Sequence, residues 1–573
     1  MIILIYTYFK MSLETKISDN YIYDSTFDAP ESDTQKTPFL RKNLTFVTDS
    51  QNGSGTYTSG QLTFDGTSLA AVGGNSVQDW ANAYIVLPYN VKVSINSATG
   101  SAPTGGNTTG MNYLAGLKNN SLIDSITVEH MGKTIINQTA NLSHLVNFKM
   151  HAITSPSDLQ KASATRQYYP DSVGNATTTA SIAGTKNTDN NPTPVISTTA
   201  GSSLDSAEFY NAGFLRRQQM MSGALATNFN TAAYLKQEAD YYQSVTAFPT
   251  TVTATAVNCY DLHYNAIIYL KDLSDYFAKH TISRGAGYKI YLRVNQAVTD
   301  LTTASTAVPF SVVPTNVITT LTSGTVQPAM LSIGANSLCA NYTLTTAAVH
   351  HLVVTSTIDT TANARPNGLR LYVPGYDCSP DTIEKITKQP IIKRPFMDVF
   401  NNVIQNQLTQ AYINQQIAGA ISRPCAIIVI PQLAQATQTQ ASQASVFNPC
   451  PGTTDPLLSL TQIQIKVGSQ YILPDRLNYS FNAFIENTAQ MFGLNGNQSR
   501  ELSSGVIDIQ KFRNNYRYYA FDLSRYPEAQ GATPQLISLE CFNNSSVAVD
   551  LYVYVLWNRD CSVNILDGSI EVE

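Results

Sequence analysis

Charged side chains are scarce in this sequence. Asp, Glu, Lys and Arg make up 13% of its 573 residues, against about 25% in a typical soluble chain. The formal net charge is -5, and no run of Lys or Arg occurs, so direct binding to nucleic acid by neutralising phosphates is not expected. The pairs Arg216-Arg217 and Lys393-Arg394 indicate solvated or subunit-facing charges instead. Ser, Thr, Asn, Gln and Tyr must supply the solubility.

Cysteine is also sparse and forms no motif. The seven cysteines are odd in number, widely spaced and without a CxxC pair. This pattern argues against a disulfide framework and against a zinc site, and it favours reduced thiols. Their positions are 259, 339, 378, 425, 450, 541 and 561.

Long apolar runs are missing at the start of the chain. The opening, MIILIYTYFKMSLETK, has an apolar run of only about eight residues, with no basic segment before it and no small-residue cleavage site after it. We therefore expect neither a secretion signal nor a transmembrane segment. Met11 is an alternative translation start.

Motifs that carry catalysis are not found. The sequence has no Walker-type glycine loop, GxSxG elbow or HExxH pair. The GAGY at 285–288 lacks the remaining glycine spacing of a dinucleotide site. His350 and His351 are adjacent in a strand-like run, so their side chains point to opposite faces and do not readily share a metal. We expect no catalytic residue, no cofactor, no metal, and a protein that is not an enzyme.

Aromatic residues are plentiful but uneven, with 32 Tyr and 21 Phe against 2 Trp. Tyrosine suits surfaces that are half buried and half wet, such as large protein interfaces. It is also simply a common strand residue.

A period of two dominates the last part of the chain. From Val547 the odd positions are mostly apolar and the even ones are largely polar or tyrosine. This alternation predicts a strand with one face on a core. The odd set includes Val549, Leu551, Val553, Val555 and Trp557, and the even set includes Asp550, Tyr552, Tyr554 and Asn558.

Strand patterns of this kind recur along the chain with few helices between them. Apolar residues at helical spacing predict helices over 141–153 and 478–493, an aromatic helix around Leu270 to Phe277, and a short one at 111–117. Residues 1–41 form a polar N-terminal arm. Residues 42–378 form a first domain with a Ser/Thr/Asn-rich loop insertion around 155–203, and residues 379–573 form a second. Both halves share a strand, aromatic helix, strand order.

Two stretches resemble a known family. GLRLYVPGYDCSPDTIEK with the following IIKRPFMDVF, and the ending from YRYYAFDLSR to ILDGSIE, are similar to the barrel junction and the last strands of double jelly-roll major capsid proteins. This lineage includes adenovirus and the tailless membrane-containing phages. Within it, the sequence most resembles the capsid proteins of Polinton-like viruses and virophages. YDLHYNAIIYLKDLSDYFAKH looks like the helix-bearing late part of the first barrel.

This resemblance implies an all-β fold of two eight-stranded antiparallel jelly-roll barrels side by side, with short helices in the loops. It further implies a major capsid protein of an icosahedral dsDNA virus, whose homotrimer forms a pseudo-hexameric capsomer. The implied partners are the chain itself, neighbouring capsomers, penton and minor capsid proteins, without sequence-specific nucleic acid binding. The implied location is the capsid shell of the virion.

Two other classes stay open on the sequence. One is a virion spike or carbohydrate-binding surface adhesin built from jelly rolls, and the other is a polysaccharide-degrading β enzyme, whose paired carboxylates are not recognisable in a single sequence. On the capsid interpretation, the apolar odd face of the last long strand fills the second barrel. Tyr552 and Tyr554 on its even face are then predicted to contact a neighbouring barrel or subunit.

Overall fold

The structure, a computed structural model, describes a little under three fifths of the chain. The predicted arm (1–41) and insertion (155–203) lie almost wholly outside the described residues, as does Met11. The described residues are 39–50, 60–67, 76–97, 114–117, 122–155, 157–158, 234–238, 241–245, 256–280, 282–285, 287–305, 316–331, 348–359, 369–434, 459–473, 476, 478–492, 505–514, 516–531, 533–545, 548–566 and 568–572.

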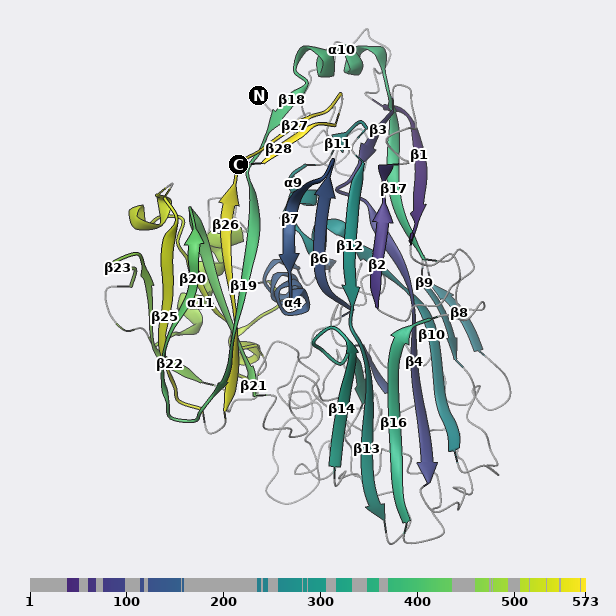
Figure 1. Ribbon diagram of the computed structural model, residues 1–573, viewed down its shortest axis with the longest axis vertical. Helices are drawn as coiled ribbons and strands as arrows, with labels where there is room; N and C mark the ends of the chain where they lie inside the picture. Colours follow the sequence, from purple (N-terminus) through teal and green to yellow (C-terminus); the bar gives the residue numbers. More distant parts are fainter. Residues whose placement is uncertain are drawn as a thin grey trace, which may run out of the picture.

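Two antiparallel β units lie side by side (Figure 1). The core strands of the first unit form two sheets. One has the order β1-β17-β4-β10 and the other the order β2-β12-β6-β7. Their bounds are β1 Phe39–Thr48, β2 Gln61–Asp65, β4 Tyr84–Ser97, β6 Ile123–His130, β7 Lys133–Thr139, β10 Ala256–Tyr269, β12 Tyr288–Val294 and β17 Arg370–Cys378.

The second unit repeats this arrangement. Its two sheets have the orders β19-β26-β21-β24 and β20-β25-β22-β23. Counted along the chain, the eight strands of each unit pair as 1-8-3-6 and 2-7-4-5, two sheets linked by Greek-key connections. The bounds are β19 Phe396–Gln407, β20 Tyr412–Ile421, β21 Pro424–Leu433, β22 Leu460–Val467, β23 Gln470–Tyr471, β24 Tyr519–Asp522, β25 Gln535–Asn543 and β26 Val549–Arg559.

The predicted all-β double jelly-roll class is therefore confirmed, but the first unit exceeds eight strands. Its larger sheet has eleven, because the β13, β14 and β16 extension pairs along β4 and further strands join at β10 and β17. The seven strands added to this sheet are β3 Ser76–Asp79, β8 Tyr234–Glu238, β9 Tyr241–Val245, β11 Ile282–Ser283, β13 Gln296–Ser305, β14 Asn316–Ser323 and β16 Ala348–Ile358. The strands β5 Leu114–Leu117 and β15 Ala329–Leu331 form a separate two-stranded sheet.

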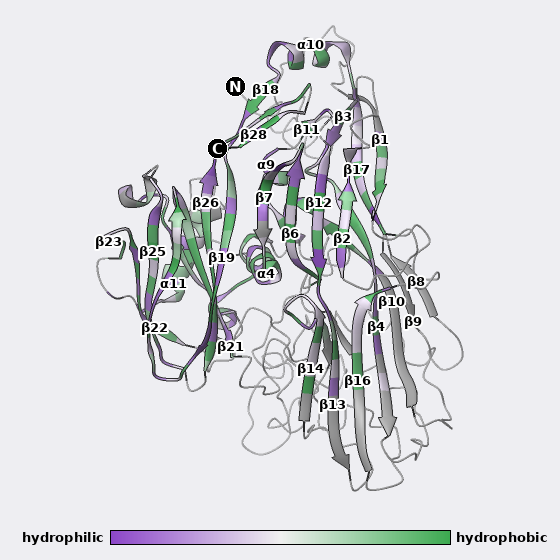
Figure 2. Ribbon diagram, in the orientation of Figure 1, coloured by the Kyte–Doolittle hydropathy of each residue, from purple (hydrophilic) through white to green (hydrophobic). Residues whose placement is uncertain are grey.

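Alternating side chains build the cores of both units. Figure 2 shows apolar and polar residues alternating along β6 and β12. On β12, the residues are buried and accessible in strict alternation, and Ile290 and Leu292 are among the buried ones. Such a strand places one face on the core and the other towards solvent. His350 and His351 lie on β16, as the sequence predicted for a strand.

In the part of the chain that the structure describes, helices are few and sit in connections. The predicted helix over 141–153 is α4 Leu142–Ile153, and the one over 478–493 is α11 Phe481–Phe492. The others are α8 Leu270–Leu273, α9 Asp275–Lys279, α10 Pro380–Lys388, α12 Ile509–Asn514 and the 3-10 turn η4 Pro527–Gln530.

Two helix predictions need correction. The helix predicted at 111–117 is wrong over its described part, because residues 114–117 form β5 and pair with β15. The aromatic helix around Leu270 is two short helices, since Ser274 has an extended backbone and its hydroxyl accepts a hydrogen bond from the Tyr276 amide, which starts a new helix.

The predicted division at 378/379 stays a prediction. Strand β17 ends at Cys378 and α10 begins at Pro380, capped by the Ser379 hydroxyl. After α10, the three-stranded sheet of β18 Ile391–Lys393, β27 Cys561–Asn564 and β28 Ile570–Val572 lies at the same end of the molecule (Figure 1).

Candidate functional site: the contact between the two units

Strand β26 is buried on both faces. Its odd residues, such as Val553 and Val555, belong to the core of the second unit. Its even residues Tyr552, Tyr554 and Leu556 belong instead to the cluster that includes the core of the first unit. Residues 549 to 556 are all buried. A sheet face that would meet solvent in an isolated sandwich is therefore buried against a second unit.

The neighbouring strands repeat this division. On β21, Ile427 and Val429 face the core of the second unit, whereas Ile428 and Ile430 join the cluster shared with the first. Alternate residues of one strand point to opposite faces, so the whole β19-β26-β21-β24 sheet separates two apolar regions. This explains why the β21 sequence, PCAIIVIPQL, is apolar on both faces from Cys425 to Pro431.

Helix α4 supplies much of the first unit's side of the contact. Ten of its twelve residues are buried, including the polar His144, Asn147 and His151. The His144 ring lies 4.6 Å from the Tyr552 ring, and the His151 ring lies 4.0 Å from the Tyr516 ring. A helix that is buried on nearly every side lies inside the protein rather than on its surface.

Hydrogen bonds fix the register between α4 and the sheet. The Tyr554 hydroxyl donates to the Asn141 carbonyl oxygen at 2.7 Å, just before the helix begins. The Tyr518 hydroxyl lies 3.1 Å from His151 Nδ1 near the other end of the helix. Burial raises the pKa of Tyr554 well above its usual value, so this hydroxyl stays protonated and able to donate.

A buried ion pair reinforces one edge of the contact. The Arg559 guanidinium lies 2.9 Å from the Asp398 carboxylate and also donates to the Ile135 carbonyl oxygen of the first unit at 2.7 Å. Burial raises the pKa of Asp398, while Arg559 acts in the opposite direction. The pair is only 12% and 5% exposed, so removing one partner would leave an uncompensated buried charge.

A second polar cluster lies near α9. The Asp275 carboxylate accepts a hydrogen bond from the Met397 amide at 2.9 Å, and the His280 Nε2 atom lies 3.1 Å from the Arg394 carbonyl oxygen. Tyr276 packs edge-on against Phe396 with ring centres 5.2 Å apart. Burial lowers the pKa of His280 to about 4, so the ring is neutral at physiological pH.

Gly505 allows close approach on the far side of α4. The next residue, Val506, donates its amide hydrogen to the His151 carbonyl oxygen at 2.9 Å. Gly505 has a φ of +66°, and a Cβ atom there would overlap the carbonyl oxygens of His151 and Ala152. Only glycine adopts this positive φ and fits this close to the two carbonyl oxygens without strain.

The terminal strands close the top of the contact. Val77 and Cys378 of the first unit cluster with Ile565, and Ile383 and Ile386 of α10 pack against them. The Arg284 amide donates to the Ile565 carbonyl oxygen at 2.9 Å. The helix that joins the two units thus also packs on both.

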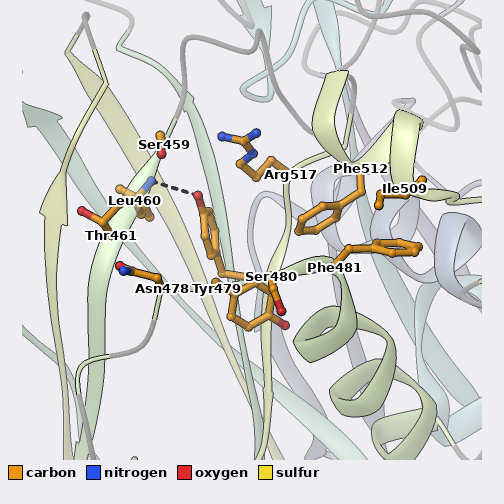
Figure 3. Close-up of a pocket in the computed structure, with 11 residues that line it drawn as sticks. Ser459, Leu460, Thr461, Asn478, Tyr479, Ser480, Phe481, Ile509, Phe512 and Arg517 are labelled. Atoms are coloured by element: carbon orange, nitrogen blue, oxygen red, sulfur yellow. Dashed lines mark hydrogen bonds between the residues drawn. The ribbon is translucent and has the colours of Figure 1, made fainter.

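A separate pocket of about 300 Å³ opens on the second unit (Figure 3). Phe481, Phe512 and Ile509 lie on one side of it and the start of β22 on the other. Arg517 is the one charged residue among its eleven lining residues. These eleven residues supply no acid and base pair for catalysis.

Over the described ranges, no group of three or more His, Cys, Asp and Glu residues is placed to hold a metal ion. In the same ranges, no helix is both long and apolar enough to cross a membrane. The cysteines at 378, 425, 541 and 561 are buried free thiols.

The structure places both predicted interface tyrosines, Tyr552 and Tyr554, against the first unit. Whether either contacts another subunit stays a prediction. Sequence reasoning missed the first unit's partners, above all Asn141 and His151. The helical spacing of α4 was visible in the sequence, but burial of its polar side as well as its apolar side was not.

No family model matches the sequence, and no curated protein matches it. Among solved structures, the chain is similar to the mavirus major capsid protein, with 12% identity, a TM-score of 0.48, and 97% of this chain and 95% of that one covered. It is similar to a chain of the Sputnik virophage, with 9% identity, a TM-score of 0.44, and coverage of 96% and 91%. It is also similar to the Faustovirus major capsid protein, with 10% identity, a TM-score of 0.42, and 96% of each chain covered. The jelly-roll assignment itself rests on the strand order of this chain.

Proposed function

We propose that this chain is the major capsid protein of an icosahedral virus. In this proposal, three copies form a pseudo-hexameric capsomer that tiles the shell. The observation that carries it is the repeated strand order of two units joined through a buried sheet face. Three chains around one axis would supply six similar units, and a six-sided tile packs hexagonally.

The character of the contact supports a structural role. The second unit buries one sheet face in its own core and the opposite face against the first unit, so the two units share a broad apolar contact. Broad apolar contact of this kind is typical of permanent assemblies. The chain's low charge and many tyrosines fit further contacts between copies.

The finer parts of the proposal follow from the resemblance in sequence. Residues 42–378 and 379–573 are the two jelly rolls, and residues 11–40 of the N-terminal arm (1–41) order beneath or between neighbouring capsomers. Penton and minor capsid proteins are the other partners, and the location is the virion. The protein acts without catalysis, cofactor or sequence-specific binding to nucleic acid.

Electron microscopy of the purified full-length chain tests this proposal. We expect six-lobed particles that form hexagonal arrays as the protein concentration rises. Isolated two-lobed particles at every concentration would contradict it. Deleting residues 1–41 is expected to leave the six-lobed particle intact while weakening the arrays, and arrays of unchanged stability would remove the role of the arm.

A further inference from the structure

Four aromatic rings form a row across the outward face of the first unit's sheet. The row consists of Phe46, Tyr372, Tyr84 and Tyr269, one from each of β1, β17, β4 and β10. The rings belong to residues that are direct partners in the strand pairing. Successive ring centres are 6.0, 5.3 and 5.8 Å apart. We call this set the aromatic row.

The aromatic row is exposed at Phe46 and partly exposed at its three tyrosines, and a cation lies at each end. Phe46 is 47% exposed, and Leu44 beside it on β1 is 53% exposed. The Arg370 guanidinium lies 4.1 Å from the centre of the Phe46 ring, and the Lys271 Nζ lies 5.4 Å from that of Tyr269. Exposed aromatic residues flanked by cations are characteristic of a protein interface.

The equivalent face of the second unit shows what covers such a surface. The sheet β19-β26-β21-β24 holds the same places in the strand order as β1-β17-β4-β10. Its outward tyrosines, Tyr552 and Tyr554, are covered by helix α4, which follows the fifth core strand of the first unit. Among the described elements, no helix of the second unit packs on the aromatic row in this way.

Helix α11 is the counterpart of α4 in the second unit, because it too lies between the fifth and sixth core strands. Unlike α4, it has an accessible side, where Asn482 and Glu486 are exposed and Ile485 is partly exposed. Ile509 at the start of α12 is 54% exposed. The accessible side of α11 thus combines apolar area with a carboxylate, which complements the cations of the aromatic row.

We propose that the aromatic row of one copy docks on the accessible side of α11 in a second copy, so that Glu486 meets Arg370 at the Phe46 end of the row. This inference rests on the proposed capsid function and names the surfaces that join its chains. The contact repeats between chains the packing that α4 makes within a chain. The strands β1 and β17 lie on the side of the first unit away from the second (Figure 1). Such a head-to-tail contact closes into a ring when the rotation allows.

Cysteine crosslinking in the full-length chain tests the pairing. A chain carrying both Phe46→Cys and Ile485→Cys is expected to form covalent dimers and trimers on oxidation, whereas the wild type and each single variant stay uncrosslinked. Dimers from Phe46→Cys alone would mean that two aromatic rows face each other and would overturn the proposal. Absence of crosslinks in particles that remain six-lobed would also overturn it, while leaving the capsid function in place.

A charge exchange gives a second test. Phe46→Glu places a carboxylate opposite Glu486 and is expected to weaken association between chains at least tenfold, as loss of a central interface aromatic does. Adding Glu486→Lys to that variant restores association. Leu536→Glu, at a 44% exposed residue on β25, is the matched control and leaves association unchanged. Equal effects of Phe46→Glu and Leu536→Glu, measured by sedimentation, would contradict the proposal.

Discussion

Individual polar residues hold the two units in one register. Apolar packing between a helix and a sheet is not directional. The hydrogen bonds of the Tyr554 hydroxyl and the Arg559 guanidinium therefore determine the positions of α4 and β7 along β26. Both groups donate to main-chain carbonyl oxygens, of Asn141 and Ile135. Removing such a donor from a buried carbonyl destabilises the fold, because water does not replace the lost hydrogen bond.

The Tyr554→Phe substitution tests this function of the hydroxyl. It removes one of the two donors to the Asn141 carbonyl, since the His144 amide also donates there, and it keeps the ring. We expect a loss of about 1 kcal/mol in the free energy of unfolding. Urea denaturation followed by fluorescence measures it. Tyr471→Phe, whose side chain is 49% exposed, is the control and should change the midpoint very little. A Tyr554→Phe midpoint equal to the control's would contradict the account.

His280 makes the contact sensitive to acid. Its pKa is about 4 in the folded protein against 6.5 for an unperturbed histidine, so the unfolded chain takes up the proton first as the pH falls. Stability is therefore full above about pH 6.5 and is lost between there and about pH 4, by up to about 3 kcal/mol. Asp275 acts to raise this pKa, and Arg394 is the cation that acts to lower it.

The His280→Gln variant isolates this contribution. Glutamine does not titrate, so the variant is expected to lose less stability between pH 6.5 and pH 4 than the wild type. Thermal unfolding at several pH values in this window measures the difference. Parallel pH profiles for the two proteins would show that His280 is not the group responsible.

At the level of elements, α4 and the segment after α11 are in close contact through Gly505. Gly505→Ala adds a methyl group against the His151 and Ala152 carbonyl oxygens and forces a left-handed backbone on alanine. We expect a loss of more than about 2 kcal/mol, since the strain alone costs about 1. Chemical denaturation provides the measurement.

Gly132→Ala is the matched control for this substitution. Gly132 also has a positive φ, of +77°, but a Cβ there would meet nothing within 4 Å. The control therefore loses stability only through backbone strain. The difference in the free energy of unfolding between the two variants measures the cost of the overlap at Gly505. Equal losses would mean that the α4 contact does not need a glycine.

Sequence periodicity predicted some elements well and others badly. The alternation along β26 predicted both the strand and its two distinct faces, because successive side chains of a strand point to opposite faces. The four residues LAGL of β5 are too few to show a period. Their conformation is that of a strand paired with β15, and the helix prediction was therefore wrong. The sequence also matched α11 with the helices near Leu270, whereas the strand order matches it with α4.

The partners across the contact could not be derived from the sequence. Tyr554 and Asn141 are 413 positions apart, and no local pattern encodes a contact at that distance. The burial of His144 and His151 was also invisible, since a polar helix face normally indicates solvent. What the tyrosines of β26 did reveal was a face suited to contact, which is where the structure places the first unit.

At the scale of the whole molecule, the two joined units serve as one building block. Each unit has the same strand order, and the buried sheet face between them fixes their relative position. A chain built this way presents two similar but unequal surfaces to its neighbours. Three chains are then enough for a six-sided tile, which is the central claim of this account.

Native mass spectrometry of the purified full-length chain tests that claim most directly. A trimer of three 62.4 kDa chains has a mass of about 190 kDa, and the account predicts this species at micromolar concentration and neutral pH. A chain that remains at the mass of a monomer or a dimer under these conditions would contradict it.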